Sequence, residues 1–448
     1  MKLLAVVHQF LPRHITGTEQ YVRAIVLAMR RAGVDARVFA YEPLVQADSP
    51  DSNWVERDEV VEGIPVRRIG LHHALSRDVH LRDYDNPMAA QALARQLDEF
   101  PCDVVHVFHP RNVGRAVVDE PAARGIPVVV NLMDFWWICP NYLLLRRDGA
   151  LCDGPPERGL GCIGCIDPEL AGRLERAGML QAMGGLAEAA RPAGNHGGSD
   201  PRKALALVGR KEHLMSVLNR ADRVVAPSRF IAGIYGGHGL DPRRLVHLPY
   251  GLDPGRFRAA PQRAPRTDRA TFDVGYIGSI TRHKGLHVLL DALQHAKSPA
   301  LRLHVHGSRE SQPGWSDALV DGIRDPRVVF HGPFGPAELG GVLGSLDALV
   351  VPSLWYENTP FTVLEALHAR VPVVASDLGG IREVVGEGRN GLLFPAGDAA
   401  ALGAILYRMA TGQGPELSMA GCDVPPIDQN VEQLLGIYRE LGAPAARA

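Results

Sequence analysis

The chain has 448 residues, which is long for one domain and suggests two or three. Hydrophobic residues make up 46% and charged residues 22%, as in globular proteins with an ample core, and the net charge of −2 gives no basic field that would recruit nucleic acid. No apolar run is long enough to span a membrane or to form a signal peptide. We therefore expect a cytoplasmic protein that contacts at most the inner face of the membrane, peripherally.

In the first half of the chain, short apolar strands alternate with amphipathic helical stretches, a pattern typical of a parallel α/β domain. The expected elements are strand 3–8, helix 17–32, strand 36–41, helix 87–100 and strands 103–108, 127–132 and 223–226. Ligands bind at the carboxyl ends of strands in such sheets. The loop from the first strand to Gly17 is therefore a candidate ligand loop, because glycine lets backbone amides approach closely.

Two further strand ends in this half carry groups suited to acid–base chemistry or substrate positioning. His106 and His109 lie at the end of strand 103–108, and Asp134 follows strand 127–132. A single histidine beside a strand is more often a structural group, so the structural interpretation is favoured for each histidine. The aromatic residues 135–137 are expected in the core or in the wall of a cleft.

Four of the six cysteines lie in an irregular insertion that we expect at about residues 139–200. One Cys-x-x-Cys pair plus two separate thiols can bind a structural zinc ion, whereas free thiols explain the pattern equally well, and a disulfide or an iron–sulfur cluster is a weaker alternative. The glycine-rich residues 194–199 are expected to form a mobile loop. The four cysteines are Cys139, Cys152, Cys162 and Cys165.

The alternation of strands and helices stops near residue 252, and the polar, proline-containing segment 259–266 is typical of an interdomain linker. It then restarts, with strands expected at 272–277, 301–306, 328–331, 348–351, 372–375 and 391–394 and a final helix at 430–441. We predict an α/β fold with two Rossmann-like domains at residues 1–252 and 253–427. The C-terminal segment 428–448 could pack back on the first domain.

The most informative segment follows strand 348–351 and contains two glutamates eight positions apart, Glu357 and Glu365. Thr359 is expected as the N-cap of a helix and Pro360 as its first residue, and the N–H groups at that helix end form an anion site. Carboxylates beside a bound phosphate can accept hydrogen bonds from sugar and ribose hydroxyls. The segment therefore predicts a nucleotide-sugar pocket; a helix that merely begins with acidic residues is the alternative.

A glycine-containing turn with cations follows strand 272–277, beginning at Gly278 and Ser279. Such a turn can neutralise a diphosphate leaving group, and Lys284 is the best candidate, whereas Arg282 could equally be a solvated surface charge. The Gly379–Gly380 pair could complete the phosphate site or be a plain turn. Sequences typical of a phosphate-binding P-loop or of a metal-bound nucleotide-sugar site are absent, so no catalytic metal is expected.

Taken together, these segments resemble the family 4 retaining glycosyltransferases of the two-domain GT-B fold. The resemblance is strongest in residues 275–285 and 348–394, with further similar segments at 221–228 and 249–253. It implies two Rossmann-like domains facing across a cleft that closes on the donor. It also implies sugar transfer with retained anomeric configuration and no cofactor or metal for catalysis.

By this resemblance, Glu365 binds the donor ribose, Glu357 lies near the transferred sugar and the diphosphate, and Lys284 holds the diphosphate. Gly17 belongs to the loop that closes over the donor. We assign catalytic roles to Glu357, Lys284 and Asp134. The expected donor-binding residues are Gly17, Gly278, Ser279, Arg282, Lys284, Glu357, Thr359, Pro360, Phe361 and Glu365.

Two positions depart from the family pattern. Ser279 stands where the family often has arginine, and Arg282 could substitute for it from another position. Met133 stands where the family often has histidine before the aspartate, which argues against a His–Asp pair and leaves Asp134 to act alone.

We predict a retaining glycosyltransferase that moves a sugar from a nucleotide-sugar donor to an acceptor hydroxyl, in polysaccharide or glycolipid synthesis. The acceptor is a glycan, a lipid-linked molecule or a small molecule, and nucleic acid is not expected as a partner. The alternatives are a nucleotide-sugar epimerase or a sugar phosphorylase on the same fold, and a non-catalytic nucleotide-sugar-binding protein. The departures at Ser279 and Met133 favour the last.

Overall fold

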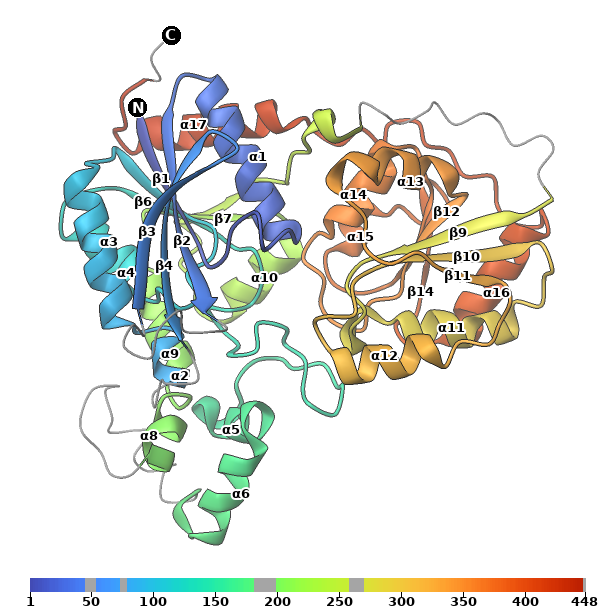
Figure 1. Cartoon of the computed structure of the whole chain (residues 1–448), viewed down its shortest axis with the longest axis horizontal. Helices are drawn as coiled ribbons and strands as arrows, with labels where there is room; N and C mark the ends of the chain where they lie inside the picture. Colours follow the sequence, from blue (N-terminus) through green and yellow to red (C-terminus); the bar gives the residue numbers. More distant parts are fainter. Residues whose placement is uncertain (45–53, 73–78, 181–198, 258–269, 446–448) are drawn as a thin grey trace. The chain divides into compact units, whose positions relative to one another are not determined.

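The computed structural model describes residues 1–44, 54–72, 79–180, 199–257 and 270–445. The chain forms two compact units, one of Met1–Pro249 with Ile427–Ala448 and one of Tyr250–Pro426. The C-terminal helix α17 (Ile427–Glu440) thus belongs to the first unit, where it packs against α1 (Gly17–Arg31) (Figure 1). The expected linker at 259–266 and the glycine-rich stretch at 194–198 lie outside the described residues.

The first unit is built on an eight-stranded sheet with the order β3–β4–β2–β1–β5–β6–β7–β8. The pairs are parallel except for the antiparallel pair of β3 with β4. The central strand β1 is closely packed, since its residues from Leu3 to Val7 are 0% exposed. The strands are β1 (Lys2–Val7), β2 (Asp35–Leu44), β3 (Trp54–Val61), β4 (Ile64–His72), β5 (Val104–Val107), β6 (Val128–Asn131), β7 (Arg223–Ala226) and β8 (Leu245–His247).

Helices flank this sheet, with α1 and α17 beside one face and α3 and α4 on the other side (Figure 1). Asn86 caps α3 by accepting a hydrogen bond from the Ala89 backbone N–H, and Pro87 occupies its first turn. The other described helices of the unit are α2 (Val79–Arg82), α3 (Pro87–Glu99), α4 (Ala116–Ala122), η2 (Pro156–Gly159), α5 (Leu160–Ile166), α6 (Pro168–Arg176), α8 (Ser199–Leu205), α9 (Arg210–Leu218) and α10 (Arg229–Gly237).

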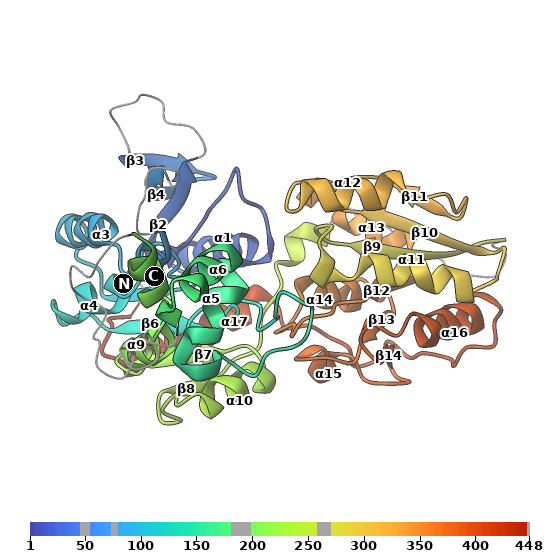
Figure 2. The same cartoon turned by 90° about the horizontal axis from the view of Figure 1, so that it is seen from below.

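The second unit has a six-stranded parallel sheet, whose strands lie in the order β11–β10–β9–β12–β13–β14 (Figure 2). Its strands are β9 (Phe272–Ile277), β10 (Leu301–His306), β11 (Val328–Phe330), β12 (Ala348–Val351), β13 (Val373–Ser376) and β14 (Gly391–Phe394). Its helices are η3 (Pro254–Phe257), η4 (Arg282–Lys284), α11 (Leu286–His295), α12 (Pro313–Asp321), η5 (Pro336–Glu338), α13 (Leu339–Ser345), α14 (Phe361–His368), α15 (Ile381–Val384) and α16 (Ala399–Ala410).

Alternate residues of the second sheet pack into two separate core layers, one on each face. In β12, Ala348 and Val350 pack with α11 and α16, whereas Leu349 and Val351 pack with α13 and α14. This is the period-two alternation of a strand covered on both faces, and it explains the continuous apolar run in the sequence.

In each sheet the order of strands reverses at one position. The first strand of the first unit, β1, pairs with β2 on one side and β5 on the other, and in the second unit β9 pairs with β10 and β12. Loops that leave such neighbouring strands diverge to opposite faces and open a crevice where ligands bind. The fold therefore singles out the loops after β1 and β5, and those after β9 and β12.

The predicted fold class, two parallel-sheet α/β domains, is confirmed. Some elements differ from expectation. The hairpin β3–β4 and the edge strand β8 were not predicted, and the insertion is not irregular throughout, because it contains α5, α6 and the start of α8. Asp167 caps α6 by accepting a hydrogen bond from the Leu170 backbone N–H at 2.9 Å. Throughout the described ranges, every helix is too short or too polar to cross a bilayer.

Candidate functional site

Glu357 is the centre of the polar group in the second unit. It lies in the loop after β12, is 4% exposed, and uses one oxygen, Oε1, to accept three hydrogen bonds. The donors are the Lys284 ammonium at 2.7 Å, the Ser353 hydroxyl at 2.7 Å and the Trp355 indole N–H at 2.9 Å. Because Lys284 comes from the segment after β9, this ion pair joins the two strands at which the sheet order reverses.

The positive charge of Lys284 stabilises the ionised form of Glu357. Burial by itself raises the pKa of Glu357, but the charge of Lys284 and the hydrogen bonds from Lys284, Ser353 and Trp355 outweigh burial and lower the pKa below its usual range. Glu357 is therefore a carboxylate at neutral pH. The Lys284 ammonium also lies 5.0 Å from the centre of the Trp355 ring, and its side chain is 28% exposed. It is thus a cation that is held in place and still reachable by a ligand.

Two glycines allow the backbone to approach closely around this pair. Gly379 has φ +66°, and a Cβ there would lie 2.4 Å from the Glu357 carbonyl oxygen, which accepts a hydrogen bond from the Gly380 N–H at 2.7 Å. Gly285 has φ +74°, and a Cβ there would lie 1.8 Å from the Pro352 carbonyl oxygen. The Gly379–Gly380 pair therefore positions the backbone of Glu357.

The helix after Glu357 begins later than predicted. Pro360 has φ −63° and ψ 126°, which is extended backbone, so it is the N-cap and α14 begins at Phe361. The prediction that Thr359 is the N-cap and Pro360 the first helical residue is wrong by one position, because proline's fixed φ suits extended backbone as well as helix. Glu365 lies in the second turn of α14 and is 4% exposed.

The remaining residues of the glycine turn after β9 have identifiable contacts. The Gly278 N–H donates to the His306 carbonyl at 3.0 Å, and the Ser279 carbonyl accepts from the Tyr276 hydroxyl at 2.9 Å. The exposed Arg282 places its guanidinium 5.0 Å from the centre of the Trp315 ring in α12. These contacts direct Arg282 toward α12, and its role in donor binding stays a prediction.

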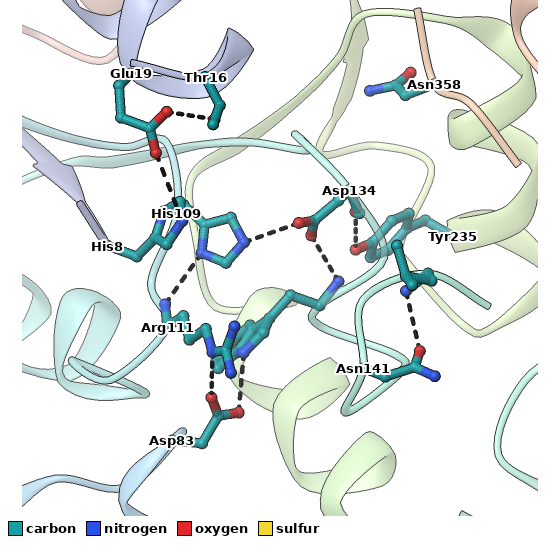
Figure 3. Close-up of polar contacts among 12 residues, drawn as sticks. His8, Thr16, Glu19, Asp83, His109, Arg111, Asp134, Asn141, Tyr235 and Asn358 are labelled. Atoms are coloured by element: carbon teal, nitrogen blue, oxygen red, sulfur yellow. Dashed lines mark hydrogen bonds and ion pairs between the residues drawn. The ribbon is translucent and has the colours of Figure 1, made fainter. Parts of the chain in front are cut away.

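In the first unit, side chains from the ends of β1, β5 and β6 meet (Figure 3). The His109 Nε2 lies 3.0 Å from Asp134 Oδ2, and the rings of His8 and His109 have their centres 4.0 Å apart. The backbone N–H of Arg111 donates to His109 Nδ1 at 3.3 Å, so Nδ1 is the acceptor nitrogen and Nε2 carries the proton. His109 therefore donates a hydrogen bond to the Asp134 carboxylate.

This pair corrects the expectation that Asp134 acts alone. The residue before it, Met133, contributes no imidazole, but His109 supplies one from the neighbouring strand. The only signal available in the sequence was that both residues lie at the ends of consecutive predicted strands, which the structure places side by side. Asp134 is further held by the Trp136 backbone N–H, at 2.8 Å from Oδ1, and by the Tyr235 hydroxyl, which donates to its carbonyl at 2.8 Å (Figure 3).

The loop before α1 brings a carboxylate to the same place. Gly17 is the first residue of α1, and the Thr16 hydroxyl before it hydrogen-bonds to Glu19 (Figure 3). Glu19 is 1% exposed, and its Oε1 lies 3.8 Å from His8 Nε2. Burial is the largest cause that lowers the pKa of His8 well below its usual range, and the nearby basic groups add to it, so His8 is neutral at pH 7.

A buried ion pair of Arg210 and Asp83 holds the two segments that contact the His109–Asp134 pair. Arg210, 1% exposed, donates to Asp83 at 2.9 Å and to the Trp136 carbonyl at 2.8 Å. Asp83 also accepts hydrogen bonds from Arg111 Nε and from the Trp136 indole, both at 3.0 Å. Because backbone N–H groups of Arg111 and Trp136 contact the His109–Asp134 pair, Asp83 links the two segments that orient it.

His106 is a structural group. Its Nε2 lies 2.9 Å from Asn131 Oδ1 and its Nδ1 lies 2.5 Å from the Tyr438 hydroxyl of α17. Its side chain is fully buried, and burial lowers its pKa to about 4. It therefore joins β5, β6 and α17 as a neutral imidazole, as the favoured interpretation of a single histidine predicted.

The four cysteines of the insertion border one cavity of about 450 Å³. Cys139 and Cys162 are buried, Cys152 and Cys165 are partly exposed, and all four are free thiols. Nowhere in the described part of the chain do three or more His, Cys, Asp or Glu side chains already stand as a metal site.

Solved structures with the same fold include two whose molecules match over nearly their whole length. The Anabaena protein HepE, in complex with UDP and glucose, has a TM-score of 0.64 at 16% identity and covers 98% of this chain and 99% of its own. Sucrose-phosphate synthase from Thermosynechococcus elongatus has a TM-score of 0.66 at 17% identity and covers 99% of both chains. These similarities define the fold of both units as GT-B.

Two family models match, one in each unit. The model described as "Glycosyl transferase 4-like domain" matches residues 16–161, and "Glycosyl transferases group 1" matches residues 271–411. Together they cover more than half of the chain, and the predicted resemblance is confirmed: the chain belongs to glycosyltransferase family 4 with the GT-B fold.

Two curated relatives show how far sequence similarity extends. The chain is 26% identical over 249 residues to the D-inositol 3-phosphate glycosyltransferase of Corynebacterium urealyticum, covering 50% of this chain and 58% of that protein. It is 33% identical over 163 residues to the phosphatidyl-myo-inositol mannosyltransferase of Mycobacterium leprae, covering 35% and 42%. The chain thus spans about half the length of the curated relatives it matches.

Proposed function

We propose that this protein transfers a sugar from a nucleotide-sugar donor to an acceptor hydroxyl. The observation that carries the proposal is the Lys284–Glu357 ion pair, which lies where the second sheet reverses its strand order. When the bond between the sugar and the diphosphate of the donor breaks, the nucleoside diphosphate departs, and negative charge develops on its oxygen in the transition state. A cation held in place before the reaction stabilises that charge without reorganisation.

Each residue around the ion pair has a role in this proposal. Lys284 contacts the diphosphate, and Glu357 keeps the ammonium in position while its own backbone is held by Gly379 and Gly380. The N-terminal end of α14 adds the positive end of a helix dipole. Glu365, in the second turn of α14, accepts hydrogen bonds from the donor ribose.

In the first unit, the Asp134 carboxylate accepts a hydrogen bond from a sugar hydroxyl, of either the acceptor or the transferred sugar. His109 holds it in the required orientation by donating from Nε2. Asp134 is then the group that touches substrate, and His109 acts as a positioning residue, because both of its ring nitrogens already have hydrogen-bond partners in the protein. Gly17 lies in the loop beside this pair, and that loop contacts the donor.

Family membership supports the finer parts of the proposal. Retention of the anomeric configuration follows from the resemblance, and Lys284 supplies the positive charge that a metal ion provides in other sugar transferases, so we propose activity in the presence of chelator. The acceptor belongs to polysaccharide or glycolipid synthesis, as a glycan, a lipid-linked molecule or a small molecule. With a lipid-linked acceptor, the enzyme works in the cytoplasm at the inner face of the membrane.

The names of relatives and structural neighbours support a nucleotide-sugar donor. The HepE structures contain UDP, or UDP-glucose, and the Corynebacterium and Mycobacterium relatives are named as glycosyl- and mannosyltransferases. A thermal-shift panel of uridine, guanosine and adenosine diphosphates and their sugars tests this directly. A ligand at 100 times its Kd stabilises the folded protein by about 2.7 kcal/mol.

We expect one base to raise the unfolding temperature of the wild type. Glu365→Ala should lose that shift, whereas Glu416→Ala, which replaces an exposed glutamate of the same unit, should keep it. No shift with any nucleotide would contradict the proposal. Interconversion of nucleotide sugars without acceptor, or transfer to free phosphate, would instead support an epimerase or a phosphorylase, and binding without any reaction would support a binding protein.

A further inference from the structure

Four thiols of the first unit lie around a single cavity that the proposed sugar transfer does not use. The cavity, of about 450 Å³, is bordered by all four cysteines of the insertion. We propose that Cys139, Cys152, Cys162 and Cys165 bind one zinc ion, which joins segment 139–152 to helix α5 within this insertion.

The cysteines approach the cavity as two pairs from two local structures. Cys139 and Cys152 flank a short hairpin, in which the Cys152 N–H donates to the Leu144 carbonyl at 2.9 Å. Cys162 and Cys165 are three residues apart on α5, so their side chains share one face of the helix. Four thiolates delivered as two pairs by separate elements are the ligand set of a closed structural zinc site.

Backbone and side-chain groups already surround the sulfur atoms. The backbone amides of Asn141 and Leu144 hydrogen-bond to the Cys139 sulfur, and the Asn141 side-chain amide approaches the Cys165 sulfur at 3.8 Å. Such donors around a metal-bound thiolate are the outer shell that orients it and disperses its charge. Asn141 therefore connects a cysteine of the hairpin with one of α5.

In the metal-free protein, two of the thiols donate hydrogen bonds to nearby oxygen atoms. The Cys139 thiol donates to Asn141 Oδ1 at 2.8 Å, and the Cys152 thiol donates to the Gly154 carbonyl at 3.1 Å. Because no three described side chains already stand at ligating positions, the ion would draw the sulfurs toward the cavity. Binding forms four Zn–S bonds and releases the four thiol protons to solvent.

The insertion has little else to stabilise it. It contributes three of the six buried members of a small apolar cluster, the other three lie just after residue 200, and partly buried side chains complete the cluster. A core of that size gains much from a disulfide or a metal that joins its parts. The four cysteines are free thiols, so they are available as metal ligands. The cluster members are Ile163, Leu170, Leu174, Ala204, Leu207 and Val208.

The test is elemental analysis of the full chain, purified without chelator from zinc-containing medium. We expect about one zinc per chain in the wild type, and almost none in Cys162→Ser and Cys165→Ser. Cys102→Ser and Cys422→Ser remove the two buried cysteines outside the insertion and should leave the zinc content unchanged. Cobalt added to chelator-treated wild type should give the intense visible bands of a tetrahedral thiolate complex.

If the Cys162 and Cys165 variants do not fold, zinc binding by the thiols can still be tested in the wild type. A mercurial reagent should release the zinc in proportion to the thiols that it modifies. A wild type that holds no metal after purification and after reconstitution with zinc would overturn the proposal. So would zinc that survives in both serine variants, or iron with the absorption of an iron–sulfur cluster in place of zinc.

Discussion

Both units carry a polar pair at the carboxyl ends of two neighbouring parallel strands, yet the pairs differ in chemistry. In the second unit, the loops after β9 and β12 bring together an ammonium and a carboxylate, Lys284 and Glu357. In the first unit, the loops after β5 and β6, beside β1, bring together an imidazole and a carboxylate, His109 and Asp134. The fold determines where a site lies, and the residue types determine whether it binds an anion or moves and orients a proton.

The two pairs also differ in how they are supported. Glu357 is held by close neighbours in sequence, Ser353 and Trp355, in addition to Lys284. Asp134 and His109 also have local partners, the N–H groups of Trp136 and Arg111, but these two segments are linked by Asp83 and Arg210, which lie far away in sequence. The local contacts of Glu357 therefore come from one short segment, whereas both pairings, Lys284 with Glu357 and His109 with Asp134, become visible only in three dimensions.

The largest expected effect is the loss of kcat on removing the Lys284 ammonium, compared with removing another lysine of the second unit. Lys284→Met should lower kcat by about 10²- to 10³-fold, the usual loss when a preorganised donor to developing negative charge is removed. Lys297→Met replaces an exposed lysine of the same unit and should leave kcat unchanged. Initial rates of sugar transfer at saturating donor measure both.

A double variant controls for folding in that experiment. Lys284→Met leaves Glu357 buried without its cation, which destabilises the protein, and adding Glu357→Gln removes the unpaired charge. The double variant should recover stability in urea unfolding but not activity. Recovery of kcat together with stability would show that the pair is structural only.

The next effect concerns the pH dependence of stability in the first unit. His106 is neutral when folded, with its pKa lowered by burial to about 4, whereas an unfolded histidine titrates near 6.5. Between these values the unfolded state binds more protons, so stability should fall as pH drops from about 6.5 to about 4, by about 3 kcal/mol in total.

Urea unfolding of wild type and His106→Gln at pH 7 and pH 4.5 measures this contribution. The glutamine variant should start less stable at pH 7 and lose less stability on acidification than the wild type does. Equal losses in the two proteins would mean that His106 does not carry the effect.

A slightly smaller effect is expected at the His109–Asp134 pair. Asp134→Asn and His109→Ala should each lower kcat about 10²-fold, the low end of what a positioned acid–base group contributes. Met133→Leu changes the residue where family members often have histidine, and it should alter kcat little, because His109 is the group that contacts Asp134. A large loss for Met133→Leu alongside a small one for His109→Ala would reverse the assignment.

The smallest effect tests the backbone support of Glu357. Gly379→Ala and Gly412→Ala both place a side chain at positive φ, which costs about 1 kcal/mol or more in each. Only at Gly379 does the new Cβ meet other atoms, at 2.4 Å from the Glu357 carbonyl oxygen, whereas nothing lies within 4 Å at Gly412. We therefore expect a further loss of stability and about tenfold lower kcat for Gly379→Ala alone.

Prediction from sequence worked best where one short segment carries the whole signal. The bounds of β9, β10, β12 and β14 agree with the predicted strands, because each is a short apolar or alternating segment followed directly by glycine or proline. The hairpin β3–β4 escaped prediction because Pro65 and the buried Arg68 interrupt its apolar pattern. Its turn at Glu62–Gly63, both at positive φ, was the available signal.

The sequence by itself determined the α/β class, the Glu357–Glu365 segment, the glycine turn that leads to Lys284 and the gathering of four cysteines in one insertion. These features follow from spacing along the chain, which periodicity and turn chemistry express locally. Only the tertiary structure decided that Lys284 pairs with Glu357, that His109 contacts Asp134 from 25 residues away, and that His106 is buried against Tyr438. Each of these depends on which strands and helices become neighbours, and sheet order is set by the packing of the whole unit.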